Sequence, residues 1–270
     1  MPFPKAPRVL VTGAGSGLGR AISVSLARRG ARVVGTDLDE SLLEETGGQV
    51  RSAGGVWYGT VADVGRWADW KRLESSVSDR MGGLDILVNN AGVAVLGRIG
   101  EVPIEDWLWQ LDVNLRGVIY GCHLFVPGMR RQRSGFILNV ASAAGFASAP
   151  EMGPYSVSKA AVISLTETMG AELKTEGITA TVLCPTFFRS QLSQRTRVTS
   201  DRLQRMSKKL IDGAQWTAER VAMDALSGLE SGRLYVIPQP DARAIYRLKR
   251  ALGPRFVGFL QWYRRRGSGR

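Results

Sequence analysis

The chain has 270 residues, of which 44% are hydrophobic, so it can bury one large core or two small ones. No apolar run approaches the ~18 residues of a membrane span, and the start of the chain has no apolar stretch typical of a signal region. One histidine and two cysteines, Cys122 and Cys184, cannot build a typical metal site or a disulfide framework. We therefore expect no metal, reduced thiols and a cytoplasmic location.

The expected strands and helices alternate along the chain. Short apolar patterns predict strands at Arg8–Thr12, Arg32–Thr36, Gly55–Val61, Leu84–Asn89, Gly135–Val140, Ile178–Cys184 and Arg233–Ile237. Helical periodicity is expected at Gly17–Arg29, Asp39–Ala53, Trp67–Met81, Ile104–Arg131, Pro154–Glu176 and Thr217–Ser231. Seven strands separated by helices predict an α/β fold, with a doubly wound parallel seven-stranded sheet covered by helices on both faces. This Rossmann order would be 3-2-1-4-5-6, extended by a seventh strand.

The net charge of +12 is concentrated in a C-terminal tail. Residues 241–270 hold nine Arg or Lys and one acid, whereas the other 240 residues hold 27 basic and 23 acidic side chains. We expect residues 1–240 to form a single domain, with 241–270 as a basic helical tail. Because the excess of basic residues lies in the tail, the body of the chain is not expected to bind nucleic acid, whereas the tail could contact an anionic surface.

A glycine-rich turn, Thr12-Gly-Ala-Gly-Ser-Gly-Leu-Gly19, lies between the first expected strand and its helix. Glycines let the backbone approach a pyrophosphate, and a helix N-terminus offers unpaired N–H groups. Asp37 ends the second strand 24 residues after Gly13, where a carboxylate would bond the adenosine ribose and repel a 2′-phosphate. The pattern predicts NAD rather than NADP. Arg20 could reach a phosphate instead, but we interpret it as a solvated helix side chain.

A second informative stretch contains Tyr155 and Lys159, which are four residues apart and share one helix face. Pro154 is suited to the first turn of that helix. A lysine cation ~5 Å from a phenol, at an effective dielectric of ~20, would lower the phenol pKa by about two units from ~10. Such a shift favours acid–base catalysis, although the pair by itself could be an ordinary helix pair.

Taken together, these features resemble the short-chain dehydrogenase/reductase family, of the single-domain kind, over residues 8–238. The motifs that carry the resemblance are the glycine turn, Asp63-Val64 after the third strand, Asn89-Asn-Ala-Gly92 after the fourth, Asn114 in Asn114-Leu-Arg-Gly117, and Ser142 placed thirteen residues before Tyr155. The resemblance implies that Tyr155 exchanges a proton with the substrate oxygen, Lys159 lowers its pKa and holds the nicotinamide ribose, and Ser142 hydrogen-bonds the substrate. Asn114 would hold a water that links Lys159 to solvent. The implied cofactor contacts are Gly13, Ser16, Gly17, Leu18, Gly19, Asp37, Leu38, Asp63, Val64, Asn90, Ala91, Gly92, Tyr155, Lys159, Pro185, Phe188 and Ser190.

The chain departs from the family pattern after the sixth strand, in Cys184-Pro-Thr-Phe-Phe-Arg-Ser190. Thr186 stands where the family usually has glycine, so the backbone there loses freedom. Ser190 stands in the place of a threonine that holds the carboxamide, so that a hydroxyl is kept. Phe187 and Phe188 could shape the pocket or pack under the loop.

Residues 189–215, called the lid segment here, fall where this family builds its substrate lid. The segment holds seven basic residues and part of it should be an amphipathic helix, whose basic face is either solvated or attracts an anionic or membrane-held substrate. The candidate pocket walls are apolar and suggest a hydrophobic secondary alcohol or ketone: Val93, Val95, Leu96, Phe146, Ala147, Met152 and Phe187.

The tail should contain a helix at Asp241–Leu252 and a second apolar stretch at Phe256–Tyr263. That stretch is too short to span a bilayer. It would pack over a neighbouring subunit or the pocket mouth, as tails in this family often do, or lie at a membrane surface. We expect a dimer or tetramer, as in the family, with peripheral membrane contact as the second interpretation.

The leading hypothesis is an NAD(H)-dependent oxidoreductase that acts on a hydrophobic secondary alcohol or ketone. A membrane-surface lipid or sterol dehydrogenase of the hydroxysteroid or retinol type is the alternative. A non-catalytic dinucleotide-binding scaffold is less favoured, because Ser142, Tyr155 and Lys159 are all kept.

Overall fold

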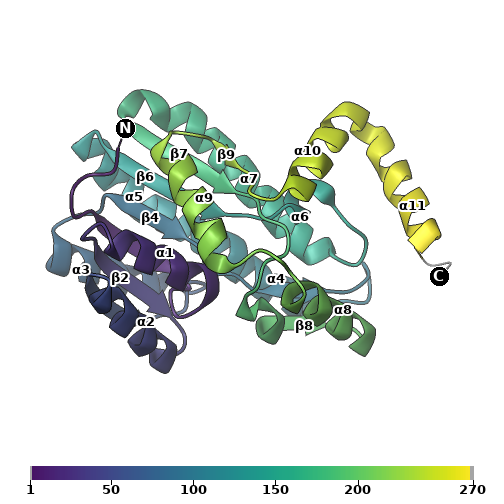
Figure 1. The fold of residues 1–270 in the computed structure, drawn as a ribbon, viewed down its shortest axis with the longest axis horizontal. Coiled ribbons are helices and arrows are strands. Elements are labelled where there is room, and N and C mark those ends of the chain that lie inside the picture. The colour runs from purple at the N-terminus through teal and green to yellow at the C-terminus, as the bar shows by residue number, and fades with distance from the viewer. Residues whose placement is uncertain (1, 268–270) are drawn as a thin grey trace.

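The central feature of the structure, a computed structural model, is one parallel sheet of seven strands (Figure 1). The structure describes residues 2–267, without the side chains of Ser193 and residues 262–267. The strands are β1 (Arg8–Thr12), β2 (Arg32–Asp37), β3 (Val56–Val61), β4 (Ile86–Asn89), β6 (Gly135–Val140), β7 (Ile178–Leu183) and β9 (Tyr235–Val236). Their order, β3-β2-β1-β4-β6-β7-β9, confirms the predicted doubly wound fold.

Alternate residues of the strands supply two hydrophobic cores, one on each face of the sheet. In β1, Val9 and Val11 belong to one core and Leu10 to the other, because successive side chains of a strand point to opposite faces. Both cores consist mainly of buried aliphatic side chains, with aromatic ones such as Trp70 and Phe136 among them, which explains why most strands are recognisable as apolar runs in the sequence.

Helices cover both faces (Figure 1). The core that contains Val9 is closed by α1 (Gly17–Ala27), α2 (Glu40–Ser52) and α9 (Ala218–Glu230). The core that contains Leu10 is closed by α3 (Trp67–Met81), α5 (Gly117–Gln132) and α7 (Gly153–Leu173). Cys122 and Cys184 are free and buried.

The long helix predicted before the fifth strand of the sheet is interrupted. It consists of α4 (Ile104–Leu111), the π-helical turn η1 (Asp112–Arg116) and α5. π-helical turns inside α-helices often occur at functional sites. The turn contains Asn114, whose side chain is fully buried.

The lid segment is tied to the body by a second, small sheet that the sequence did not predict. In this sheet β5 (Ala94–Leu96) pairs in parallel with β8 (Thr196–Val198). The turn η3 (Gln191–Arg195) precedes β8, and α8 (Asp201–Asp212) follows it. Strands of three residues are too short to give a clear sequence pattern.

The tail begins against the body and then leaves it. Helix α10 (Pro240–Leu252) buries Ala242 and packs Tyr246 against Phe146 of the short helix α6 (Ala144–Ala147), with ring centroids 5.2 Å apart. After the 3-10 turn η4 (Gly253–Arg255), α11 (Phe256–Gly267) extends away from the sheet (Figure 1). None of the helices within residues 2–267 is long and apolar enough to cross a membrane.

Candidate active site

A cavity of about 330 Å³ lies at the carboxyl ends of the strands, next to the point where the strand order reverses between β1 and β4. Ligands of open α/β sheets bind at this position. The cavity is lined by residues of the glycine turn, by Ser142, Tyr155 and Lys159, and by the loop after β7. A second groove, lined by Leu38, Asp63 and Val64, adjoins it and shares several of its residues.

The glycine turn has the compact geometry that a bound pyrophosphate requires. Gly13 and Gly17 have positive φ angles of 62° and 50°, which L side chains rarely adopt. A Cβ on Gly19 would lie 2.1 Å from the Gly13 carbonyl oxygen, so glycine is required for the turn to close on its own helix. Asn90 fixes the turn from the neighbouring strand end, since its Nδ2 donates to the carbonyl oxygens of Thr12 and Gly13.

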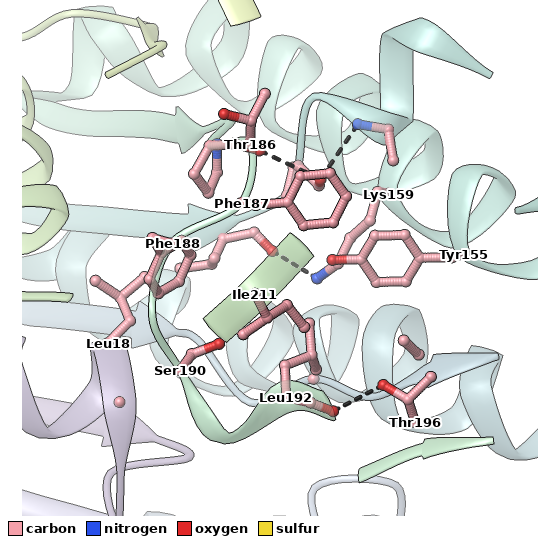
Figure 2. A pocket seen from close by; sticks show the side chains of 18 of the residues that line it. Leu18, Tyr155, Lys159, Thr186, Phe187, Phe188, Ser190, Leu192, Thr196 and Ile211 are labelled. Atoms are coloured by element: carbon pink, nitrogen blue, oxygen red, sulfur yellow. Dashed lines mark hydrogen bonds between the residues drawn. The ribbon is translucent and has the colours of Figure 1, made fainter. Parts of the chain in front are cut away.

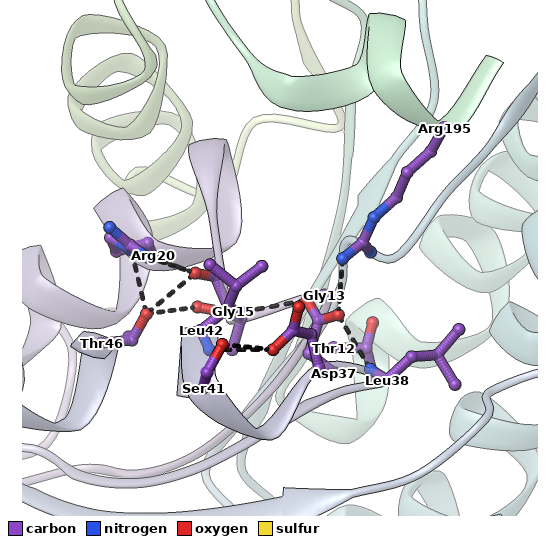
Figure 3. A network of polar contacts seen from close by, with 12 residues as sticks. Thr12, Gly13, Gly15, Arg20, Asp37, Leu38, Ser41, Leu42, Thr46 and Arg195 are labelled. Carbon is purple, nitrogen blue, oxygen red and sulfur yellow. Dashed lines mark hydrogen bonds and ion pairs between the residues drawn. The ribbon is translucent and has the colours of Figure 1, made fainter. Parts of the chain in front are cut away.

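Asp37 presents a buried carboxylate at the end of β2, with a side chain that is only 1% exposed. It accepts hydrogen bonds from the backbone N–H groups of Gly15, at 3.1 Å, and Leu38, at 2.8 Å. It also accepts one from Arg195 Nη2 at 3.0 Å (Figure 3). Two elements distant in sequence, the glycine turn and the lid segment, therefore meet at this carboxylate.

Arg20 has a structural role that the sequence did not predict. Its guanidinium is mostly buried, donates to the Gly15 carbonyl and to Thr46, and forms an ion pair with Glu45 (Figure 3). The interpretation as a solvated helix side chain is wrong, because the arginine ties the glycine turn to α2. The hydrogen bonds to the Asp37 carboxylate come instead from Gly15, Leu38 and Arg195.

Tyr155, Lys159 and Ser142 meet in the cavity (Figure 2 shows the first two beside Phe187). Lys159 Nζ lies 5.8 Å from the centroid of the Tyr155 ring and donates to the Val140 carbonyl oxygen at 2.8 Å. Ser142 forms a hydrogen bond with the Tyr155 hydroxyl, and its own Oγ donates to the Pro185 carbonyl oxygen at 3.3 Å. The first turn of α7 thus holds the tyrosine where the ends of β6 and β7 can reach it.

Burial controls the protonation of this cluster. It raises the pKa of Tyr155 to about 12, and the hydrogen bond with Ser142 offsets only part of that effect. Burial also lowers the pKa of Lys159 to about 8. The expectation that the lysine brings the phenol close to neutrality is therefore not met, because desolvation of the phenolate is the larger effect. At neutral pH the tyrosine is a proton donor beside a lysine that is mostly charged.

Asn114 lies behind the cavity rather than in its wall. Its Oδ1 accepts from the Val93 backbone N–H at 2.8 Å, and its Nδ2 donates to the Val93 carbonyl oxygen at 2.9 Å and to Ser158 Oγ at 3.1 Å. The side chain therefore braces the loop after β4 against α7. A relay through a bound water remains a prediction for this residue.

The loop after β7 is held by Gln239 and by Asp241 at the start of the tail. The Thr186 backbone N–H donates to Gln239 Oε1 and the Thr186 hydroxyl donates to Asp241 Oδ1, both at 3.2 Å. Thr186 has a negative φ, so replacement of the family's glycine causes no backbone strain. Phe187 lines the cavity and is 43% exposed, while Phe188 lines it and also packs on the core, so both alternatives hold in part.

Most of the expected site residues line the cavity: Gly13, Ser16, Gly17, Leu18, Asp37, Asn90, Ala91, Gly92, Ser142, Tyr155, Lys159, Pro185, Phe188 and Ser190. Leu38, Asp63 and Val64 line the adjoining groove, and Gly19 is buried in the turn. Among the expected walls, Leu96, Ala147, Met152 and Phe187 line the cavity. Val95 and Phe146 are buried without lining it, and Val93 lines the groove instead.

Several residues of the cavity were not predicted. Leu192, Thr196, Ser207 and Ile211 come from the lid segment and Ile245 from α10. The walls expected from the sequence are all apolar, whereas a charged residue, Arg195, lines both the cavity and the groove. The amphipathic pattern of α8 could have indicated that Ile211 is buried, but no local pattern shows what it faces.

The sequence also matches a known family over most of its length. A family model described as short chain dehydrogenase matches residues 7–201. This chain belongs to the short-chain dehydrogenase/reductase family. It is thus a member of a family of nucleotide-binding oxidoreductases with a Rossmann fold.

Two curated relatives show how the match is distributed. The chain is 33% identical over 255 residues to "Probable oxidoreductase EphD" of Mycobacterium tuberculosis, covering 90% of this chain but only 43% of that protein. It is 30% identical over 251 residues to the CLA biosynthesis dehydrogenase/reductase of Lactiplantibacillus plantarum, covering 86% of this chain and 88% of that one. This short-chain dehydrogenase/reductase therefore spans less than half of the first relative.

Solved structures with the same fold include proteins bound to either nicotinamide dinucleotide. A short-chain dehydrogenase/reductase from Burkholderia phymatum in complex with NAD is 32% identical, with a TM-score of 0.86, and the match covers 92% of this chain and 94% of that one. A short-chain dehydrogenase from Sphingobium yanoikuyae in complex with NADPH is 26% identical, with a TM-score of 0.77, and the match covers 94% and 95%.

Proposed function

We propose that this short-chain dehydrogenase/reductase uses NAD(H) to interconvert a hydrophobic secondary alcohol and its ketone. The observation that carries the proposal is that Tyr155, Lys159 and Ser142 line the same cavity as the glycine turn and Asp37. Carbonyl reduction needs a proton donor and a hydride donor, and this cavity would hold both, because a proton-transfer group and a dinucleotide site share it.

The residues present fit a nicotinamide dinucleotide. The glycine turn leaves space at Gly17, where an added Cβ would meet Ser190 at 3.6 Å and no closer neighbour. A buried carboxylate at Asp37 suits the ribose hydroxyls of adenosine, and the relative from Burkholderia phymatum is in complex with NAD. A bound nicotinamide would supply or accept the hydride.

The protein residues would manage the proton and orient the substrate. Tyr155 would donate its hydroxyl proton to the carbonyl oxygen during reduction, since its high pKa keeps it protonated at neutral pH. Ser142 would hydrogen-bond the same oxygen and stabilise the charge that develops on it. Lys159, held by the Val140 carbonyl, would place a positive charge next to the tyrosinate that results.

The substrate side of the cavity favours a neutral, apolar molecule. Its walls include Leu96, Met152, Phe187, Ile211 and Ile245. Among the described lining residues the charged ones are Asp37, Lys159 and Arg195, all assigned here to the cofactor side or to catalysis. The test is a panel of secondary alcohols and ketones, graded by size and charge and assayed with both cofactors by nicotinamide absorbance. Turnover confined to charged substrates would contradict this substrate class.

Replacement of Asp37 by alanine should weaken NAD binding. Loss of a buried carboxylate that accepts ribose hydroxyls removes charge-assisted hydrogen bonds, so we expect the Kd for NAD to rise about 10- to 100-fold and the preference for NAD over NADP to fall. Isothermal titration with each dinucleotide measures both effects. An unchanged Kd for NAD would show that the ribose lies elsewhere.

The tail is proposed to join subunits, in line with the family's tendency to form dimers or tetramers. Val257 of α11 is 59% exposed and the helix extends away from the sheet, so this side chain is available to a second copy (Figure 1). Contact with a membrane surface is the second candidate, because residues 241–270 carry a net charge of +8.

A chain that ends at Leu252 should separate these two roles. It keeps Gln239 and Asp241, which hold Thr186, so we expect cofactor binding to persist while the oligomer dissociates. Light scattering gives the mass, and sedimentation with anionic vesicles gives lipid binding. An unchanged oligomer mass together with lost vesicle binding would favour the membrane role of the tail over subunit contact. No change in either quantity would contradict both roles.

A further inference from the structure

Arg195 connects the lid segment with the cofactor side of the site. It is the last residue of η3, yet its guanidinium reaches Asp37, which lies 158 residues earlier at the end of β2. Nη2 is 3.0 Å from Asp37 Oδ1, and the arginine side chain is 37% exposed against 1% for the aspartate (Figure 3). A partly exposed cation thus covers the buried carboxylate.

The ion pair stands where the cavity and the adjoining groove meet. Asp37 and Arg195 line the cavity that contains Tyr155, and both also line the groove that contains Leu38 and Asp63. A dinucleotide that reaches from the groove to Tyr155 must pass this pair. The ribose hydroxyls would bond the Asp37 carboxylate. Because the Arg195 guanidinium bonds the same carboxylate, it would lie next to the ribose.

The other charges near this point are mostly acidic or already committed. The groove beside Asp37 is lined by the carboxylates of Asp39, Glu40, Glu44 and Asp63. Arg197, which also lines it, pairs with Asp106 and lies over the Trp109 ring, 3.7 Å from the centroid. Arg20 is bound to Glu45 and the Gly15 carbonyl. Arg195 is the cation that directly opposes Asp37.

We propose that Arg195 is a second determinant of cofactor choice, one that moderates the preference for NAD set by Asp37 and lets the chain bind NADP as well. Paired with Asp37, it cancels the negative charge that would repel a 2′-phosphate. Released from Asp37, it offers a planar fork of donors that matches a phosphate. The inference rests on the proposed function, because it takes Asp37 as the ligand of the adenosine ribose.

The test measures binding rather than turnover. The Kd values for NAD⁺ and NADP⁺ are determined by isothermal titration for the full chain and for Arg195→Gln, Arg195→Lys and Arg202→Gln. Arg202 is the matched control, because it also joins the lid segment to the body, through Glu151, without lining the cavity or the groove. Circular dichroism and thermal melts check that each variant is folded.

For Arg195→Gln we expect NADP⁺ binding to weaken about tenfold or more, while NAD⁺ binding does not weaken. Arg195→Lys keeps the charge and should retain most of the wild-type ratio of the two Kd values. Arg202→Gln should leave the ratio unchanged. Equal changes for both dinucleotides, or none, in Arg195→Gln would overturn the inference and leave Arg195 as a support of the lid segment. A wild type that binds neither dinucleotide would instead defeat the proposed function together with this inference.

Discussion

Replacing Tyr155 by phenylalanine is expected to lower kcat about 10³-fold for the best substrate, with the Kd for NADH changed by no more than about twofold. The hydroxyl is the proton donor of the proposed reaction, and phenylalanine keeps the ring while removing that proton. Because the proposed cofactor contacts lie mainly in the glycine turn and at Asp37, binding should survive. Steady-state absorbance assays and fluorescence titration of NADH measure the two quantities.

Tyr120→Phe provides the matched control. Tyr120 lies on α5, where its hydroxyl accepts from Arg116 outside the cavity, so the same chemical change should leave turnover unaltered. If Tyr155→Phe kept normal turnover, the proton would have to come from another group. The assignment of the site would then be wrong even if the cofactor bound as proposed.

Replacing Lys159 by methionine should reduce kcat/KM about 100-fold or more, because the positive charge next to the developing tyrosinate is lost. The pKa of Lys159 is about 8, so the wild-type rate of ketone reduction should fall as the pH rises through about 8 and the ammonium loses its proton. That limb of the pH profile should be missing from Lys159→Met. Lys174→Met, at an exposed position just after α7, is the control and should retain the wild-type profile.

The same variant should be at least as stable as the wild type. Burial lowers the Lys159 pKa from 10.5 to about 8, so the folded state disfavours the charged form. The resulting penalty is present in full below pH 8 and vanishes above pH 10.5. Removing the charged lysine relieves this penalty of roughly 3 kcal/mol. The variant also loses about 1 kcal/mol of stability, because methionine cannot make the hydrogen bond to Val140. Urea denaturation at neutral pH should therefore show a gain, and a clear loss of stability would contradict the burial effect.

The fold could be predicted because its signals are local. Each strand of the sheet is a short apolar run with glycines or polar residues at its ends, and the alternation with helices indicates a parallel sheet of the doubly wound kind. The strands β5 and β8 were missed for the opposite reason. Each has three residues, and paired residues are 102 positions apart, so that their pairing depends on how the lid segment folds back.

The candidate site divides in the same way. Asp37, Ser142, Tyr155 and Lys159 could be named because motifs fix them at strand ends and on one helix face. The residues that contact these side chains and hold the neighbouring loop could not be named from the sequence. Arg195 reaches Asp37, and Gln239 holds the Thr186 loop, through tertiary contacts that leave no spacing in the sequence. The pKa of Tyr155 was misjudged because the sequence shows its charged neighbour but not the extent of its burial.

The most direct measurement of the proposed function is the transfer of hydride itself. The chain is incubated with NADH that carries deuterium on the transferring face of the nicotinamide and with the most reactive apolar ketone of the panel, and the alcohol is analysed by mass spectrometry. The proposed function predicts one deuterium on the carbinol carbon of the product formed by the wild type, and no product above background from Tyr155→Phe. Alcohol that forms without deuterium, or equally well in the variant, would contradict it.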